Sequence, residues 1–242
     1  MKLLAFGGRN FRELLRDPIS AIFGLGFPLG LMAIMQTLFR HIPGMPEVFL
    51  IQSFGPGMVV FGQAFLTMFL ATLMTSDRLG AYLSRLFTAP MSGADFIGGY
   101  ALALLPLALL QGAACLALAV AFGMPLGNNL PAVLAAILAD MALFVALGLL
   151  MGGLFRSVQM TSGMCSVLVN AVAWLSGMWF PLELVGGGFY AVCRALPFYH
   201  AVKMMKCAVA GTALWPSLFW VLGYAAALAL AAVLVFRRKM RG

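Results

Sequence analysis

The chain of 242 residues is 63% hydrophobic, only 9% of its residues are charged, and its formal net charge is +8. A soluble domain of this size needs far more charge to cover its surface, so this composition excludes an ordinary soluble enzyme or binding domain. The charged residues lie in short segments between long apolar runs. The sequence therefore predicts an all-α membrane protein.

Six apolar runs are long enough to cross a bilayer, which takes roughly 20 apolar residues in a helix. They cover approximately residues 18–39, 54–75, 96–122, 130–155, 163–182 and 215–236. Charged residues precede the first run and further spans follow it, so we do not interpret it as a cleavable signal peptide. We expect residues 1–242 to form a single transmembrane domain.

The segment before the first span has the pattern of a short amphipathic helix. In residues 3–15, LLAFGGRNFRELL, leucine and phenylalanine side chains form one face, and Arg9, Arg12 and Glu13 form the other. Such a helix lies at the cytosolic membrane interface before the chain turns at Arg16-Asp17-Pro18. The alternative is a basic tail that only fixes the orientation of the chain.

The basic residues are distributed unevenly between the two sides of the membrane. With a cytosolic N-terminus, 11 of the 15 lysines and arginines fall on the cytosolic side and 4 fall outside. The positive-inside rule then makes both termini cytosolic, and the net charge reflects topology and contact with anionic lipid headgroups. The basic residues form no patch with interleaved aromatic side chains, so we expect no nucleic-acid partner.

Two spans contain glycine pairs with the spacing at which helices approach closely. Gly26 and Gly30 lie in the first span, and Gly148 and Gly152 lie in the fourth. Small residues at this spacing pack spans together inside one subunit or form an interface between two subunits. The sequence leaves both alternatives open.

The segment between the second and third spans, residues 76–99, is longer than a helical hairpin needs. It begins with an amphipathic stretch that carries Arg78 and Arg85 on one face and apolar side chains at helical spacing on the other. The apolar side chains are those of Leu79, Tyr82, Leu83, Leu86 and Phe87. Such a helix rests in lipid or binds in a groove of a partner protein.

Four polar side chains fall near the middle of the bilayer, roughly 10–17 Å deep when about 1.5 Å is counted per residue. They are Gln63, Gln111, Asp140 and Asn170. Asp140 is the only acid within a span, and an intramembrane ionisable residue is a functional candidate. It is a buried neutral carboxyl hydrogen-bonded to Gln111 or another amide, a cation or proton site, or a group used in helix kinking or assembly.

The segment before the last span, residues 183–212, is too apolar for a solvated loop. Its composition suits two short helices that break at Pro197 and re-enter the membrane, where irregular backbone must pack on protein or line a cavity. Cys193 and Cys207 lie in this segment, and they form a disulfide or stay free as small buried side chains. Neither histidine lies at metal-ligand spacing from other ligands, so we expect no metal site.

Several short motifs follow one another along the chain at defined places relative to the six spans. They are Arg16-Asp17-Pro18, Asp77-Arg78-Leu79-Gly80, Leu86…Ala89-Pro90-Met91-Ser92, Ser176-Gly177…Phe180-Pro181-Leu182-Glu183 and Leu196-Pro197…His200-Ala201. In this order they resemble the permease subunit of ABC-2 type transporters over essentially the whole chain. One departure is Asp77, where the family more often has glutamate.

The resemblance implies a fold like that of type V exporters, with six transmembrane helices, an interfacial N-terminal helix, a cytosolic coupling helix and a short re-entrant helical pair before the last span. It also implies a second permease copy, identical or related, and two ABC ATP-binding subunits that hold ATP and Mg. This chain has no G-x-x-x-x-G-K motif, so we expect no cofactor on it and ATP hydrolysis on the partner. The residues that the resemblance places against the ATPase are Asp77, Arg78, Leu79, Gly80, Tyr82, Leu83, Arg85, Leu86 and Phe87, with Arg9, Arg12 and Arg16 alongside.

The resemblance further implies that the second and fifth spans face the axis of the dimer and line a substrate cavity. The side chains expected there are those of Phe61, Phe65, Met68, Phe69, Asn170, Trp174 and Met178. Aromatic and methionine side chains form an adaptable apolar surface, suited to a drug, a lipid-like molecule or a peptide antibiotic exported through a bacterial inner membrane. The alternative for each residue is ordinary packing or lipid contact.

Other functional classes find less support in the same residues. An intramembrane enzyme needs catalytic groups, but the chain has no H-E-x-x-H motif, and no glycine stands two residues before Ser176 as in a serine-nucleophile turn. We therefore expect no catalytic residues. A secondary transporter or channel that uses the polar layer around Asp140 is the alternative, although the chain lacks the matched halves common in secondary transporters.

Overall fold

The structure is a computed structural model that describes residues 2–16, 22–39, 42, 44, 46–80, 93–126 and 129–240. In chain order its helices are α1 (Lys2–Leu15), η1 (Ile22–Gly26), α3 (Phe27–Phe39), η2 (Glu47–Phe49), α4 (Ile51–Leu79), α6 (Gly93–Ala121), α7 (Leu130–Leu154), α8 (Val158–Leu175), α9 (Leu182–Val185), α10 (Gly187–Ala195), α11 (Pro197–Ala210) and α12 (Trp215–Met240). η1 is a π-helix that runs into α3, and η2 is a 3-10 helix. The described part of the chain is all-α, as the composition predicts.

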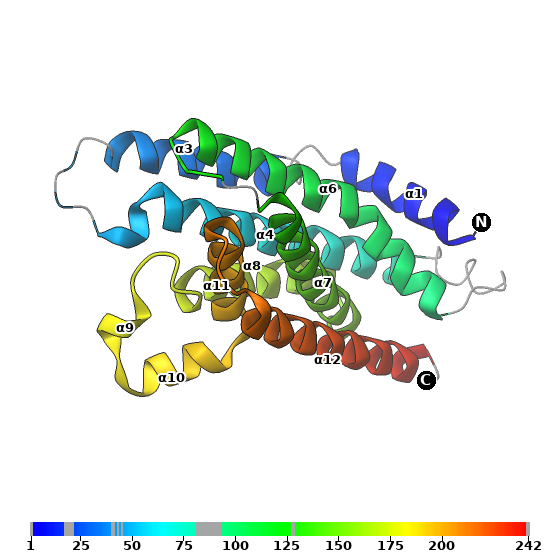
Figure 1. The fold of residues 1–242 in the computed structure, drawn as a ribbon. Helices are drawn as coiled ribbons and strands as arrows, with labels where there is room; N and C mark the ends of the chain where they lie inside the picture. Colours follow the sequence, from blue (N-terminus) through cyan, green and yellow to red (C-terminus); the bar gives the residue numbers. More distant parts are fainter. Residues whose placement is uncertain are drawn as a thin grey trace.

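Six helical stretches of the described chain are long and apolar enough to cross a membrane. They are Ile22–Phe39, Ile51–Leu79, Gly98–Ala121, Leu130–Leu154, Val158–Leu175 and Trp215–Val235. The six predicted spans are confirmed as apolar helices of sufficient length. Both termini lie at the same end of the bundle, as an even number of crossings requires (Figure 1).

The second span is longer than its apolar run predicts. Helix α4 continues to Leu79, so Asp77 and Arg78 stand in its last turn. Both residues were expected in the cytosolic segment after the span, and the structure shows that the helix itself continues through them. Their charges are tolerated on the helix because each side chain finds partners on neighbouring helices, as described below.

The fifth span begins and ends earlier in the chain than predicted. Ser157 caps the start of α8, because its side chain accepts a hydrogen bond from the backbone N–H of Met160. The helix ends at Leu175, and the chain then turns at Gly177, whose φ of 74° suits a residue without a side chain. The apolar residues beyond Gly177 belong to the following turn and to α9.

Helix α4 is the centre of the bundle and the most buried of the six spans. It contacts α3, α6, α7, α8 and α11. Helix α7 approaches α4 closely at two glycines. A Cβ added at Gly148 would lie 3.1 Å from the Thr67 carbonyl oxygen, and a Cβ added at Gly152 would lie 2.9 Å from the Ala71 carbonyl oxygen. The glycine pair of the fourth span thus packs two spans together inside one subunit.

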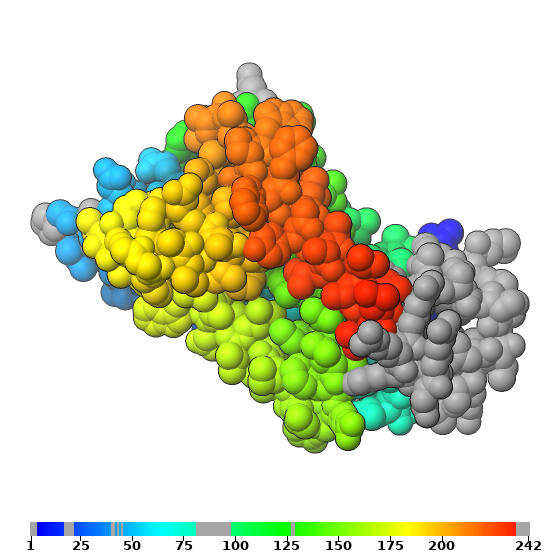
Figure 2. Space-filling view, turned by 90° about the horizontal axis from the view of Figure 1, so that it is seen from below, coloured from blue at the N-terminus to red at the C-terminus, as the bar shows by residue number. Residues whose placement is uncertain are grey.

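The segment between α8 and α12 builds the end of the bundle opposite the termini (Figure 1). Helices α10 and α11 meet at Leu196, and Pro197 occupies the first turn of α11, so the predicted helix break is confirmed. Cys193 and Cys207 are both free. Figure 2 shows this segment in yellow and orange over one end of the molecule, with α12 running from it along one side.

Candidate functional site

A buried carboxylate in the last turn of α4 joins three helices. Asp77 is 6% exposed, and its Oδ2 accepts hydrogen bonds of 2.7 Å from Arg9 Nη1 and from the Tyr100 hydroxyl. Arg9 belongs to α1 and Tyr100 to α6. A carboxylate near the C-terminus of a helix meets the negative end of the helix dipole, so its burial depends on these two donors. We name this group of three residues the Asp77 junction.

Helix α1 packs on α6 around this junction. The Phe6 ring meets the Tyr100 ring edge-on, with centroids 5.2 Å apart. Asn10 is fully buried and accepts a hydrogen bond of 2.9 Å from Arg9 Nη1. Gly99 permits the close approach, because a Cβ at this position would lie 2.2 Å from the Phe6 ring. The amphipathic helix predicted for residues 3–15 is present, and part of its apolar face rests on protein.

The next side chain along α4 reaches a different pair of helices. Arg78 donates hydrogen bonds to the carbonyl oxygen of Gly153, at 3.0 Å, and to that of Phe155. The last carbonyls of α7 have no partner within their own helix, so the guanidinium satisfies acceptors that would otherwise need water. Asp77 and Arg78 together tie the end of α4 to α1 and α6 and to the connection between α7 and α8.

The residues expected against an ATPase therefore differ in accessibility. Asp77 is buried and Arg78 is half-buried, and both bind within the subunit, whereas Leu79 and Gly80 are exposed at the end of α4. The positions Tyr82, Leu83, Arg85, Leu86 and Phe87 lie outside the described residues.

The arginines of α1 divide in the same way. Arg9 turns toward Asp77, while Arg12 and Arg16 are exposed. The Nε of Arg12 donates to the Gly8 carbonyl of its own helix, at 3.2 Å. Among the described residues expected against an ATPase, the exposed ones are thus Arg12, Arg16, Leu79 and Gly80, and we name these four the junction surface.

Sequence analysis missed Tyr100, Asn10 and the carbonyl partners of Arg78. Two signals pointed to them. Asp77 directly follows a long apolar helix, where a carboxylate requires donors. Asn10 interrupts the apolar side of the amphipathic pattern in residues 3–15, where a polar residue requires a partner.

A hollow of about 230 Å³ lies beside the junction, between α1, α4 and α8. Its lining residues are Glu13 and Leu14 of α1, Phe69, Thr72, Leu73 and Ser76 of α4, and Val158 of α8. Phe69 is one of the residues predicted to line a substrate cavity. The hollow thus brings part of the predicted cavity next to the predicted coupling region.

The other predicted cavity residues lie at different depths. Phe61 and Met178 are buried inside the chain. Met178 packs closely on Gly57, since a Cβ added at Gly57 would lie 3.1 Å from the Cβ of Met178. Asn170 and Trp174 are exposed on α8.

Phe65 and Met68 are half-buried on α4, between α3 and α8. The Phe65 ring lies 5.4 Å from the Phe27 ring of α3, and Met68 Sδ accepts a contact of 3.9 Å from the Ser166 hydroxyl of α8. A strip from α3 across α4 to α8 therefore faces outward, and a cavity over it needs a second wall.

The polar residues predicted near the middle of the bilayer are buried in three of four cases. Gln63 donates to the Ile137 carbonyl and Gln111 to the Met58 carbonyl, each at 3.4 Å. Asp140 is 0% exposed, and neither of its carboxyl oxygens has a hydrogen-bond partner among the described residues. The predicted hydrogen bond from Gln111 or another amide to Asp140 is therefore wrong, because the two buried amides bind backbone carbonyls instead.

The fourth polar residue does not belong to this buried layer. Asn170 is exposed on α8, and its amide donates to the Ser166 carbonyl of its own helix at 2.8 Å. Depth along the membrane can be counted from the sequence, but the side of the helix that carries Asn170 is set by packing.

The glycines of the first span have open space around them. A Cβ at Gly30 would meet nothing within 4 Å, and one at Gly26 would meet only Ile22 of η1, at 4.0 Å. These glycines are exposed, unlike Gly148 and Gly152. Among the residues that the structure describes, no other span packs against the first glycine pair.

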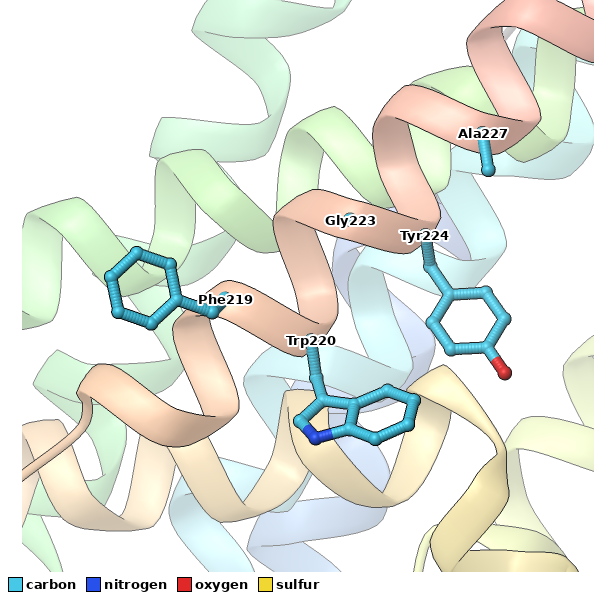
Figure 3. A pocket seen from close by; sticks show the side chains of 5 residues that line it. All are labelled: Phe219, Trp220, Gly223, Tyr224 and Ala227. Atoms are coloured by element: carbon cyan, nitrogen blue, oxygen red, sulfur yellow. The ribbon is translucent and has the colours of Figure 1, made fainter.

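An aromatic face lies on the first half of α12. A groove of about 430 Å³ there is lined by Phe219, Trp220, Gly223, Tyr224 and Ala227 (Figure 3). Trp220 stacks on His200 of α11 with ring centroids 4.9 Å apart, and the Tyr224 hydroxyl donates to the Ala195 carbonyl of α10. These contacts anchor α12 to the α10–α11 pair, and the exposed remainder suits lipid at the membrane interface.

A family model described as ABC-2 type transporter matches residues 1–208. The match runs from the N-terminus into α11 and contains the Asp77 junction, the hollow and the buried polar layer. None of the curated proteins compared with this sequence matches it.

Proposed function

This chain belongs to the ABC-2 type transporter family, and we propose that it is the permease of an ATP-driven exporter. It is a multi-pass membrane subunit of an ABC transporter, which works with an ATP-binding subunit. In our proposal it carries a hydrophobic or amphipathic molecule, such as a drug, a lipid-like molecule or a peptide antibiotic, out of a bacterial cytoplasm. Two permease copies, identical or related, pair with two ATPase subunits that hold ATP and Mg, and both termini lie on the cytosolic side of the inner membrane.

The observation that carries this proposal is the Asp77 junction. It joins α1, α4 and α6 at the end of the bundle that carries both termini, and Arg78 extends the same connection to α7 and α8. An ATPase that binds the junction surface moves all of these helices together, because buried ion pairs and packed helices shift as units. Nucleotide binding then changes the balance between an inward-open and an outward-open arrangement.

The outward-facing strip supports a second permease copy as the missing wall of a central cavity. Gly26 and Gly30 lie open on the first span, and Phe65 and Met68 lie beside it on α4. Exposed glycines permit close approach of a second helix in a membrane. Two copies that meet here would enclose Phe65, Met68 and, on α8, Trp174. The apolar character of this lining favours an apolar or amphipathic cargo.

The experiment that tests the proposal is co-purification of the ATPase from detergent-solubilised membranes. Charge reversal at Asp77 or Arg78 is a poor probe, because both residues hold the subunit itself together. Leu79→Glu is a better one, since Leu79 is 55% exposed within the junction surface. We expect this variant to lose the ATPase while its elution volume and thermal unfolding midpoint stay those of the wild type.

Leu184→Glu is the matched control, because Leu184 is 83% exposed at the opposite end of the bundle. It should retain the ATPase. A wild-type protein that brings down no ATPase, or a Leu79→Glu variant that retains it fully, would contradict the proposed coupling.

A second candidate function is favoured by one observation. Both oxygens of Asp140 are buried without a partner among the described residues, as an ion or proton site in a secondary transporter or channel would require. Asp140→Asn separates the two candidates. Transport that proceeds at the wild-type rate in this variant eliminates an ionic role, and loss of transport with intact assembly supports one.

A further inference from the structure

A polar cavity of about 290 Å³ lies at the end of the bundle far from the termini. Four parts of the chain meet around it: η2 with the start of α4, the turn after α8, helix α9 and helix α11. Its charged lining residues are Glu47, Glu183, Lys203 and Lys206. Two acids and two lysines around one cavity are unusual in a chain of which only 9% is charged.

Among the described residues, these four charges are not tied to one another: the contact recorded for their side chains is that of Lys203, whose Nζ lies 5.8 Å from the Tyr199 ring centroid. None of them forms an ion pair with another residue in the described part of the chain. Lys206 is half-buried, and burial lowers the pKa of its ammonium, an effect that the nearby Glu183 carboxylate opposes. A cation removed from water without a bonded anion is unfavourable unless a further group enters the site.

A buried hydroxyl lines the same cavity. Ser176 is 2% exposed, and its Oγ has no hydrogen-bond partner among the described residues. The turn that places it is tightly built: Gly177 has a φ of 74°, and a Cβ there would lie 3.2 Å from the Leu182 side chain. Buried hydroxyls normally find a partner, so this one is available to a ligand.

We propose that this cavity binds a small zwitterion, a molecule that carries an ammonium group and a phosphate or carboxylate a few bonds apart. Lys203, Lys206 and the Ser176 hydroxyl supply donors for the anionic oxygens, and Glu47 and Glu183 accept from the ammonium. The lining charges cancel formally, which favours a zwitterion over a simple anion or cation. A cavity of about 290 Å³ admits a molecule the size of a lipid headgroup. Pockets for drug-sized ligands usually have volumes of about 300–1,000 Å³.

The same chemistry occurs in the ethanolamine-phosphate headgroup of a membrane lipid and in free molecules such as amino acids. The site is separate from the hollow beside the Asp77 junction and shares no lining residue with it. The proposal therefore goes beyond the export function and stands independently of the transported molecule.

The test uses the full chain in nanodiscs of phosphatidylglycerol, which lacks a zwitterionic headgroup. The thermal unfolding midpoint is measured with O-phosphoethanolamine, and then with inorganic phosphate and ethanolamine separately. A ligand that binds only the folded state raises the midpoint with concentration. We expect O-phosphoethanolamine to raise it at concentrations at least tenfold below those at which either fragment acts.

Variants locate the site. Lys206→Gln, Ser176→Ala and Glu183→Gln should each weaken binding of O-phosphoethanolamine at least fivefold. Arg194→Gln is the control, because Arg194 lies on α10 against Tyr190, outside the cavity, and this variant should bind as the wild type does. Because Glu183 is exposed, its variant reports on binding without a packing defect.

A second arm distinguishes the two sources of the ligand. Protein extracted from membranes that contain phosphatidylethanolamine is examined by native mass spectrometry for retained lipid, in the wild type and in Lys206→Gln. Soluble probe binding that depends on the variants supports a free zwitterion, and retained phosphatidylethanolamine that is lost in Lys206→Gln supports a lipid headgroup. Absence of both, or equal binding of inorganic phosphate and O-phosphoethanolamine unaffected by Glu183→Gln, would overturn the proposal.

Discussion

The two ends of the bundle treat buried charge in opposite ways. At the end that carries the termini, Asp77 is bound by Arg9 and Tyr100, and its charge is satisfied by the chain itself. At the other end, Lys206 and the Ser176 hydroxyl line a cavity without a bonded partner in the described structure. A charged side chain that is hydrogen-bonded within the chain fixes helices to one another. A polar group without such a partner can still form hydrogen bonds to a ligand. The difference separates a mechanical end from a binding end.

Removal of the cation at the mechanical end should have the largest effect. In Arg9→Ala, Asp77 stays buried and keeps only the Tyr100 hydroxyl of the two junction donors. We expect this substitution to lower the free energy of unfolding by about 3 kcal/mol. The thermal unfolding midpoint of the purified chain in detergent measures this loss. Arg12→Ala is the control, because Arg12 is exposed on the same helix and its Nε donates to the Gly8 carbonyl of that helix. Similar losses in both variants would mean that the junction does not hold α1.

The second contact at the same end should be weaker. Arg78→Gln loses the charge-assisted hydrogen bonds to the Gly153 and Phe155 carbonyls, with an expected cost of about 2 kcal/mol. Arg78→Lys keeps the charge but lacks the fork that reaches two carbonyls, so its unfolding midpoint should fall between those of Arg78→Gln and the wild type. If Arg78→Lys equals the wild type, charge alone is sufficient and the fork is unimportant.

At the binding end, removal of a cation should have the opposite sign. Lys206→Met deletes a half-buried ammonium that forms no ion pair in the described chain, so stability without ligand should rise by about 1 kcal/mol. The unfolding midpoint in detergent without zwitterionic lipid is the measurement. Lys203→Met, at an exposed position of the same cavity, should change it little. A marked loss of stability in Lys206→Met would show that the lysine is structural and would remove the contrast between the two ends.

The smallest expected effect is a pH dependence at the binding end. Burial lowers the pKa of His200 below its usual 6.5, and the positive charges of Lys203 and Arg194 act in the same direction. The unfolded chain therefore binds a proton at this position more readily, so stability is greatest above pH 6.5 and falls as pH drops below it. Stability stops falling with pH once His200 is protonated in the folded protein as well.

The measurement is the unfolding midpoint at pH 7.5 and at pH 5.5 in the wild type and in His200→Phe, which preserves a ring to stack on Trp220. The difference between the two pH values should shrink in the variant. An equal difference in both proteins would assign the pH dependence to other groups.

The sequence predicts the parts of this fold that depend on a one-dimensional pattern. The six spans, the amphipathic helix of residues 3–15 and the break at Pro197 follow from hydropathy and periodicity, and the mid-span positions of Gln63, Gln111 and Asp140 follow from counting residues along the helices. Family resemblance adds the order of the parts. These features are local, or depend only on distance along a helix.

The rest depends on which helices meet, and no pattern along the chain contains that information. Gly26–Gly30 and Gly148–Gly152 have the same spacing, yet only the second pair lies against another span. Phe61 and Trp174 both read as candidates for a cavity, yet one is buried and the other is 58% exposed. The partners of Asp77 lie 68 residues before it and 23 residues after it in the chain. Only tertiary packing brings them together.

The separation of Arg9, Asp77 and Tyr100 along the chain has a consequence for biogenesis. Helix α1 is synthesised before both of its partners: the acid that neutralises Arg9 stands in the last turn of α4, and the tyrosine that completes the junction lies in α6. Arg9 has no acid until the end of α4 has been synthesised, and the apolar face of α1 has no protein partner until α6 follows. The membrane surface is the available resting place for such a segment, since amphipathic basic helices bind anionic interfaces. We therefore expect the N-terminal helix to change environment during synthesis, from lipid headgroups to protein, and to dock only after half of the spans have been inserted.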